Sequence, residues 1–141
     1  MKNSGRGLFA GAAMLFLCGA GSAQAPAFRP VGTVRQIMLG IVGPASDVIF
    51  AVPNKPPKDD TGWQTVQNSS LMLAEAGNLL MIPGRAKDKN DWMKFASQLS
   101  AVGAEAFKAA NMKNAAALDD IGNKIDALCE GCHAKYLPKQ Q

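Results

Sequence analysis

Three side chains that can bind a metal or take part in thiol chemistry lie within five positions near the C-terminus, in the stretch LCEGCHAKYLP. Cys129 and Cys132 are separated by two residues, and His133 follows directly. Such a cluster could belong to a zinc site, a thiol redox pair, a disulfide or a covalent haem attachment site. Three further features of the sequence distinguish these chemistries: whether the protein is exported, how many other ligands it has, and which secondary-structure element contains the cluster.

The N-terminus has the layout of a secretory signal peptide. Lys2 and Arg6 form a short basic region, GLFAGAAMLFLCGA is apolar, and small residues follow in GSAQA. The apolar part is too short to span a bilayer, which takes about 20 residues. We therefore expect residues 1–25 to be cleaved, Cys18 included, leaving residues 26–141 as a periplasmic protein without stable membrane insertion.

Cleavage narrows the chemistry of the cluster. Only two cysteines then remain, and His133 is the single histidine of the sequence, whereas a structural zinc ion requires four nitrogen or sulfur ligands. Redox-active C-x-x-C pairs usually open a helix that follows a strand. Here Cys129 and Cys132 come at the end of a helical pattern, and no segment shows the alternation of a strand. Neither zinc nor thiol redox chemistry fits the sequence well.

C-x-x-C-H is also the attachment motif of c-type haem. Two cysteines at this spacing reach the two vinyl groups of one porphyrin, and the adjacent histidine lies under the iron as an axial ligand. Haem is attached after export, so the signal peptide and the motif support each other. We expect one haem c, bound through Cys129 and Cys132 with His133 on the iron.

Apolar spacing of three and four residues predicts four helices with mostly short connections. The first covers residues 31–52, where Pro44 should kink or split it. The second runs over 63–81 behind a capping box of Thr61 and Gln64. The third begins at residue 90 or 91, and the fourth follows Asn114 as its N-cap. This pattern favours an all-α fold, an antiparallel up-down-up-down four-helix bundle. The predicted inner stripes are Val34, Met38, Ile41, Ala45, Val48 and Val52; Trp63, Val66, Ser70, Leu73, Gly77 and Leu80; Trp92, Phe95, Leu99, Val102, Ala106 and Phe107; and Leu118, Ile121, Ile125, Leu128 and Cys132.

These features resemble the class II c-type cytochromes, the family of cytochrome c′ and its low-spin relatives. Members of that family are four-helix bundles with C-x-x-C-H in the last helix. The similarity covers the chain after the signal: four helices, the motif at 129–133, and an aromatic residue, Tyr136, three positions after the histidine. In many members a basic residue follows that aromatic, whereas Leu137 and Pro138 stand there in this chain. A basic partner for the haem would be Lys135 or a residue of another helix.

The resemblance also implies what lies on the other side of the iron. In low-spin members a methionine of the first helix is the sixth ligand, and Met38 matches that place. Arg35, one turn earlier, resembles the first-helix arginine near a haem propionate, and Tyr136 is implied to pack near the haem edge. The alternatives to Met38 are Met72, Met81 or an open iron.

We therefore expect a periplasmic monohaem cytochrome that carries electrons and is not an enzyme. Removing Lys2 and Arg6 lowers the net charge from +4 to +2, which gives no reason to expect nucleic acid binding. The expected partners are periplasmic redox proteins, and the rate of association with them should depend only mildly on salt. A homodimer is also compatible with the sequence. Two other functions compete: a five-coordinate protein that binds nitric oxide or carbon monoxide, and a disulfide-closed helical domain without haem.

Overall fold

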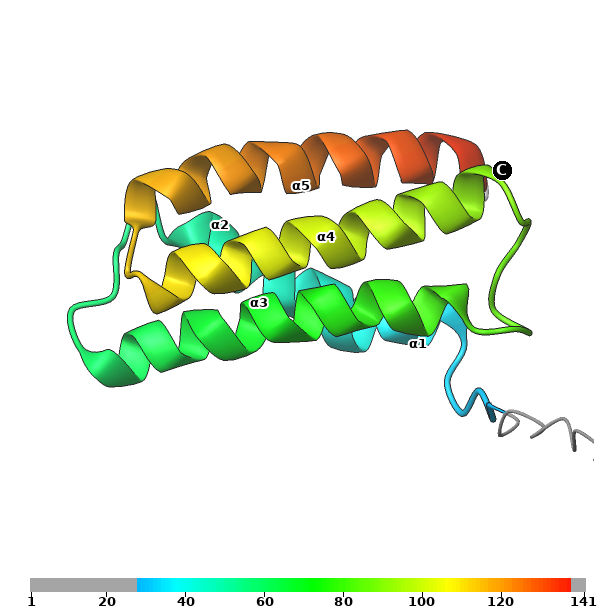
Figure 1. The fold of residues 1–141 in the computed structure, drawn as a ribbon, viewed down its shortest axis with the longest axis horizontal. Helices are drawn as coiled ribbons and strands as arrows, with labels where there is room; N and C mark the ends of the chain where they lie inside the picture. Colours follow the sequence, from blue (N-terminus) through cyan, green and yellow to red (C-terminus); the bar gives the residue numbers. More distant parts are fainter. Residues whose placement is uncertain (1–27, 138–141) are drawn as a thin grey trace, which may run out of the picture.

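The computed structural model describes residues 28–137, and within that range the chain is all-helical, with four helices and no strand (Figure 1). The first helix has three successive segments: α1 (Val34–Ile37), a π-helical turn η1 (Met38–Val42) and α2 (Gly43–Ala51). The others are α3 (Asp60–Met81), α4 (Asp91–Asn111) and α5 (Ala115–Tyr136). The predicted all-α fold is confirmed. The predicted signal peptide, residues 1–25, lies outside the described residues.

The π-helical turn is the response of the first helix to Pro44. Proline has no amide hydrogen, and its ring clashes with the carbonyl four residues earlier in an α-helix. The Gly43 amide instead donates to the carbonyl of Met38, five residues back, which widens the turn just before the proline. The chain remains helical from Val34 to Ala51, so of the two predicted effects of Pro44, a kink or a split, the split does not occur.

The predicted capping box at the start of α3 is also wrong. The N-cap is Asp59, whose carboxylate accepts a hydrogen bond of 2.8 Å from the Gly62 amide. The helix therefore begins at Asp60 rather than Trp63, and Thr61 lies inside its first turn. Aspartate and threonine are both favoured N-caps, and the earlier of the two residues took the position.

Two other helix starts follow their sequence signals. Asn114 caps α5 as predicted, since its side chain accepts from the Ala117 amide at 3.0 Å. A capping box that the sequence analysis missed precedes α1: the Thr33 hydroxyl accepts from the Gln36 amide, and the Gln36 side chain accepts from the Thr33 amide. Both caps satisfy amides that a helix end would otherwise leave unpaired.

The predicted stripes of α3, α4 and α5 supply most of the core, and α3 and α4 approach each other most closely. A Cβ atom added to Gly77 would lie 2.5 Å from the Ala96 carbonyl oxygen. One added to Gly103 would lie 2.4 Å from the Ala74 nitrogen. Glycine at these two positions is therefore what allows the backbones of α3 and α4 to touch.

The first helix packs against α3 and α5. By length and composition alone, Val34–Ala51 could cross a membrane, since its 18 residues have a mean hydropathy of 1.3; a core helix of a soluble bundle passes the same test. Its buried residues are Ile37, Val42, Ala45, Ser46, Ile49 and Val52. The predicted inner stripe of this helix is therefore wrong in part: Ala45 and Val52 are buried, but the other four predicted residues are only half-buried, because the π-helical turn shifts the register of the helix.

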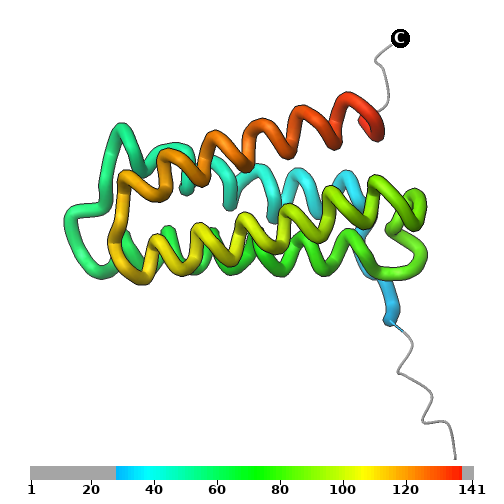
Figure 2. The backbone as a smooth tube through the Cα atoms, turned by 45° about the horizontal axis from the view of Figure 1, so that its top comes forward, coloured from blue at the N-terminus to red at the C-terminus, as the bar shows by residue number. Residues whose placement is uncertain are grey.

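A buried arginine holds the loop between α3 and α4, residues 82–90. Arg85 is only 9% exposed, and its Nε donates to the Gly32 carbonyl at 2.9 Å. Its Nη1 donates to the Leu79 carbonyl at 3.1 Å. These bonds tie the loop to the segment before α1. As a result, the start of the first helix, the end of α3 and the start of α4 meet at one end of the molecule (Figure 2).

Candidate cofactor site

The C-x-x-C-H motif lies entirely within the last turns of α5, which continues to Tyr136. In an α-helix, residues three and four positions apart share a face. Cys129 therefore shares a face with Cys132, three residues on, and with His133, four residues on. The helix thus presents two thiols and an imidazole toward one side.

That side forms one wall of a pocket between α5, α4 and the first helix. The pocket is small: its cavity volume is ≈ 30 Å³, well below the roughly 300–1,000 Å³ that is common for ligand sites, so a bulky ligand would fit only if the walls moved apart. Apart from the motif, its lining is apolar. The lining residues are Met38, Val42, Leu80, Trp92, Phe95, Ala96, Leu99, Leu128, Cys129, Cys132 and His133.

Four of the six predicted site residues meet in this pocket. Cys129, Cys132 and His133 line it from α5, and Met38 lines it from the π-helical turn of the first helix. Arg35 is exposed and does not line the pocket. The thioether, the imidazole and both thiols therefore lie around one apolar space.

Met38 differs in this respect from the other methionines. Within residues 28–137, Met38 is the only methionine that lines the pocket. Met72 is 43% exposed on α3, and Met81 is half-buried at the end of α3. The arrangement thus favours Met38 over the two alternatives as a group that could face a bound iron.

The two thiols are free and half-buried. Burial raises the pKa of both above the ordinary value of 9.0, and the carboxylate of Asp126 raises the pKa of Cys129 further. Redox-active thiols have a lowered pKa, commonly because a helix N-terminus lies beside them. Cys129 and Cys132 lie late in a helix, and their surroundings raise the pKa of both thiols instead.

Tyr136, the sixth predicted residue, lies behind the pocket wall rather than in the pocket. Its ring meets the Trp92 ring edge-on at 5.1 Å and the Phe95 ring edge-on at 6.4 Å between centroids, and both of these rings line the pocket. The Trp92 indole nitrogen in turn donates to the Leu80 carbonyl at 2.8 Å. Tyr136 therefore supports the aromatic wall from outside.

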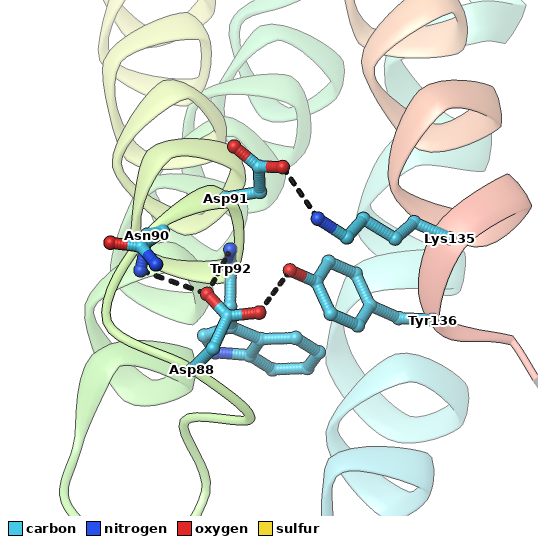
Figure 3. Close-up of polar contacts among 6 residues, drawn as sticks. All are labelled: Asp88, Asn90, Asp91, Trp92, Lys135 and Tyr136. Carbon is cyan, nitrogen blue, oxygen red and sulfur yellow. Dashed lines mark hydrogen bonds and ion pairs between the residues drawn. The ribbon is translucent and has the colours of Figure 1, made fainter.

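The Tyr136 hydroxyl donates a hydrogen bond to Asp88, which the sequence analysis did not single out (Figure 3). The other oxygen of Asp88 accepts from the Asn90 amide at 2.8 Å and the Trp92 amide at 3.1 Å. Mainly through the Tyr136 hydroxyl, these bonds hold the pKa of Asp88 below its ordinary value of 3.8. Asp88 thus joins the start of α4 to the end of α5.

Lys135 strengthens the same junction from the surface. Its Nζ lies 2.5 Å from the Asp91 carboxylate and 5.4 Å from the centre of the Tyr136 ring (Figure 3). The bond to Asp91 raises the pKa of Lys135. Since this ammonium group already has a carboxylate partner, the basic group that the resemblance calls for near a haem is engaged elsewhere.

In residues 28–137, no three side chains of histidine, cysteine, aspartate or glutamate gather as a ready-made site for a metal ion. The donors at the pocket would instead suit an iron that a porphyrin already holds. Comparison of the chain with models of known protein families, with curated proteins and with solved structures found no match.

Proposed function

We propose that this chain is an exported monohaem c-type cytochrome that carries one electron at a time between periplasmic proteins and catalyses no reaction of its own. In this proposal, an up-down-up-down bundle holds the haem near the end of α5. One observation supports it above the others. Met38 on the first helix lines the same apolar pocket as Cys129, Cys132 and His133 on the last.

The donors at the pocket fit a haem chemically. Cys129 and Cys132 would each hold the haem through one thioether bond. The His133 imidazole can coordinate the iron from α5, and the Met38 thioether can do so from the first helix. When bound, the haem supplies the one-electron change between ferric and ferrous iron.

The chain itself sets the conditions for that change. Leu80, Trp92 and Leu99 present apolar surface to the pocket, which would keep water from a bound iron and would disfavour its more highly charged ferric state. A thioether ligand together with a histidine ligand would also favour the reduced state. Both effects raise the reduction potential, as suits a protein that accepts electrons readily and passes them on.

The absorption spectrum of protein matured in a periplasm tests the proposal. We expect a low-spin haem spectrum with the far-red charge-transfer band of methionine-ligated ferric iron. High-spin ferrous protein that shifts promptly with carbon monoxide would support the gas-binding alternative instead. A protein without any Soret band would contradict both haem functions and leave a helical structural domain.

Replacing Met38 tests the sixth ligand. Met38→Ala should remove the charge-transfer band, convert the iron to a high-spin state and lower the reduction potential. Met112→Ala is the matched control, since Met112 is 60% exposed and lies beyond the pocket lining, and it should leave the spectrum unchanged. Iron that stays low-spin in Met38→Ala would show that Met38 is not the ligand.

A further inference from the structure

We propose that the second half of α5, residues 126–136, opens as a unit to admit the haem, and that two side-chain contacts with the start of α4 hold it shut until then. This inference rests on the proposed function, and it adds how a bulky group reaches a site that the fold has closed. Three observations carry it: the small volume of the pocket, the firm attachment of its other walls, and the weak attachment of the end of α5.

The closed pocket is too small for the proposed haem. Its cavity volume is ≈ 30 Å³, whereas roughly 300–1,000 Å³ is common for the sites of larger ligands. Its lining comes from the first helix (Met38, Val42), the end of α3 (Leu80), α4 (residues 92–99) and the second half of α5 (residues 128–133). Space for a haem therefore requires that one of these elements moves away from the others.

The walls other than α5 are firmly attached. Gly77 and Gly103 bring the backbones of α3 and α4 into contact, so these two helices form one unit. The first helix buries Ile49 completely, and the buried side chain of Arg85 bonds to the segment before it. Close-packed interiors resist such movement, so neither the first helix nor the pair of α3 and α4 is the wall that gives way.

The attachment of α5 to the core changes at Ile125. Up to this residue the helix is anchored by buried positions, namely Leu118, Ile121, Gly122 and Ile125. None of residues 126–137 is buried, and the half-buried ones are Leu128, Cys129, Cys132 and Tyr136. Segments with few buried apolar contacts open at a lower free energy than the rest of a protein. The second half of α5, which contains the whole C-x-x-C-H motif, can therefore open while the first half stays in place.

Two side-chain contacts fasten this second half, and we call them the latch (Figure 3). The Tyr136 hydroxyl donates to the Asp88 carboxylate, and the Lys135 Nζ lies 2.5 Å from the Asp91 carboxylate. Both carboxylates lie at the start of α4, which the Trp92 indole bonds to the end of α3. A hydrogen bond to a charged acceptor contributes more than an exposed ion pair, so the Tyr136 hydroxyl is the stronger part of the latch.

Alkylation of the two thiols measures the opening without any haem. The full mature chain, residues 26–141, is produced without haem in a cytoplasm and treated with iodoacetamide, so that a sulfur–carbon bond forms as iodide leaves. Since Cys129 and Cys132 are half-buried, we expect both to react more slowly than in the urea-unfolded chain. Their rate should depend on urea far less steeply than global unfolding does by circular dichroism. A rate equal to that of the unfolded chain, or a urea dependence equal to that of global unfolding, would overturn the proposal.

Variants of the latch locate the fastening. Tyr136→Phe combined with Lys135→Gln removes both contacts but keeps an aromatic ring, and it should speed the alkylation by about tenfold. The matched control is Lys124→Gln, which loses the ion pair with Glu105 at 2.8 Å between α4 and the first half of α5. This control should react like the parent chain. An unchanged rate in the latch variant, or an equal gain in the control, would overturn the proposal.

Uptake of added haem connects the opening with the site. Uptake through a minor open form is proportional to the population of that form. The Soret band should therefore appear faster in the latch variant than in the parent, by the same factor as the alkylation. Equal rates of uptake would show that haem enters by another path and would overturn the proposal. A Soret band in none of the chains would refute the proposed function, whereas alkylation would still show whether the second half of α5 opens.

Discussion

The interface of α3 with α4 and the pocket end of α5 are built on opposite principles. Between α3 and α4, Gly77 and Gly103 bring the two backbones into contact, and no space is left for a side chain. At the pocket, the large rings of Trp92 and Phe95 form a wall, and the facing side of α5 presents Leu128, two thiols and an imidazole. One interface is closed by small residues, and the other leaves a cavity of ≈ 30 Å³ between large ones.

The comparison separates the scaffold from the site. A tightly packed helix pair tolerates no added volume, so it can hold α4 in a fixed place. The end of α5 depends on fewer contacts with α4 and is fastened there by Asp88 with Tyr136 and by Asp91 with Lys135. This combination would let the end of α5 move aside for the proposed haem without disturbing the contact between α3 and α4.

The largest expected effect comes from removing the two thiols at the pocket. The double variant Cys129→Ala, Cys132→Ala should lose covalent haem completely, because no sulfur remains to form a thioether. Mass spectrometry of the denatured protein should show the chain without the added mass of haem. The single variant Cys132→Ala should retain one linkage, and haem that stays covalently attached in the double variant would contradict the assignment.

An intermediate effect is expected at the closed interface. Gly103→Ala places a Cβ atom 2.4 Å from the Ala74 nitrogen, and overpacking of this kind costs about 1–3 kcal/mol of stability. Urea unfolding, followed by circular dichroism, should show the loss, while the absorption spectrum of the bound haem should stay the same. If this variant unfolded like the parent protein, α3 and α4 would not be in contact at this point.

Gly40→Ala is the matched control for that experiment. An added Cβ atom at Gly40 has no neighbour within 4 Å, and alanine is the better helix former by roughly 0.5–1 kcal/mol. We therefore expect Gly40→Ala to be neutral or slightly stabilising. Opposite signs for the two glycines would separate the cost of close packing from the effect of helix propensity.

Local signals predicted the fold well. Apolar spacing located the buried faces of α3, α4 and α5, because burial of one face is what stabilises a helix in a bundle. It failed in the first helix, where Ile37, Val42 and Ile49 are buried in place of four predicted residues. The Asn114 cap also followed from the sequence, since a cap depends on neighbours three residues away. The predicted capping box at Thr61 is wrong because Asp59, two residues earlier, is the N-cap. Aspartate and threonine have similar N-cap preferences, so the sequence does not show which of the two begins the helix.

The candidate site was predictable only where one segment contains it. The C-x-x-C-H spacing identifies Cys129, Cys132 and His133 from the sequence alone. Asp88 could not be found in this way, because its partner Tyr136 lies 48 positions later and no local pattern links a loop carboxylate to a distant hydroxyl. The pairing appears only when the fold brings the start of α4 against the end of α5.

The smallest expected effect concerns that pairing and its dependence on pH. Because the Tyr136 hydroxyl lowers the pKa of Asp88 below 3.8, the folded chain stabilises the charged carboxylate more than the unfolded chain does. The contribution of the charged carboxylate to stability is therefore complete above the ordinary pKa and is lost as the pH falls below it.

Asp88→Asn keeps an acceptor for Tyr136 and removes the titration. The melting temperature of the variant should then fall less steeply with acid than that of the parent protein. Equal slopes for the parent and Asp88→Asn would mean that the end of α5 is held by the aromatic contacts of Tyr136 rather than by its hydroxyl.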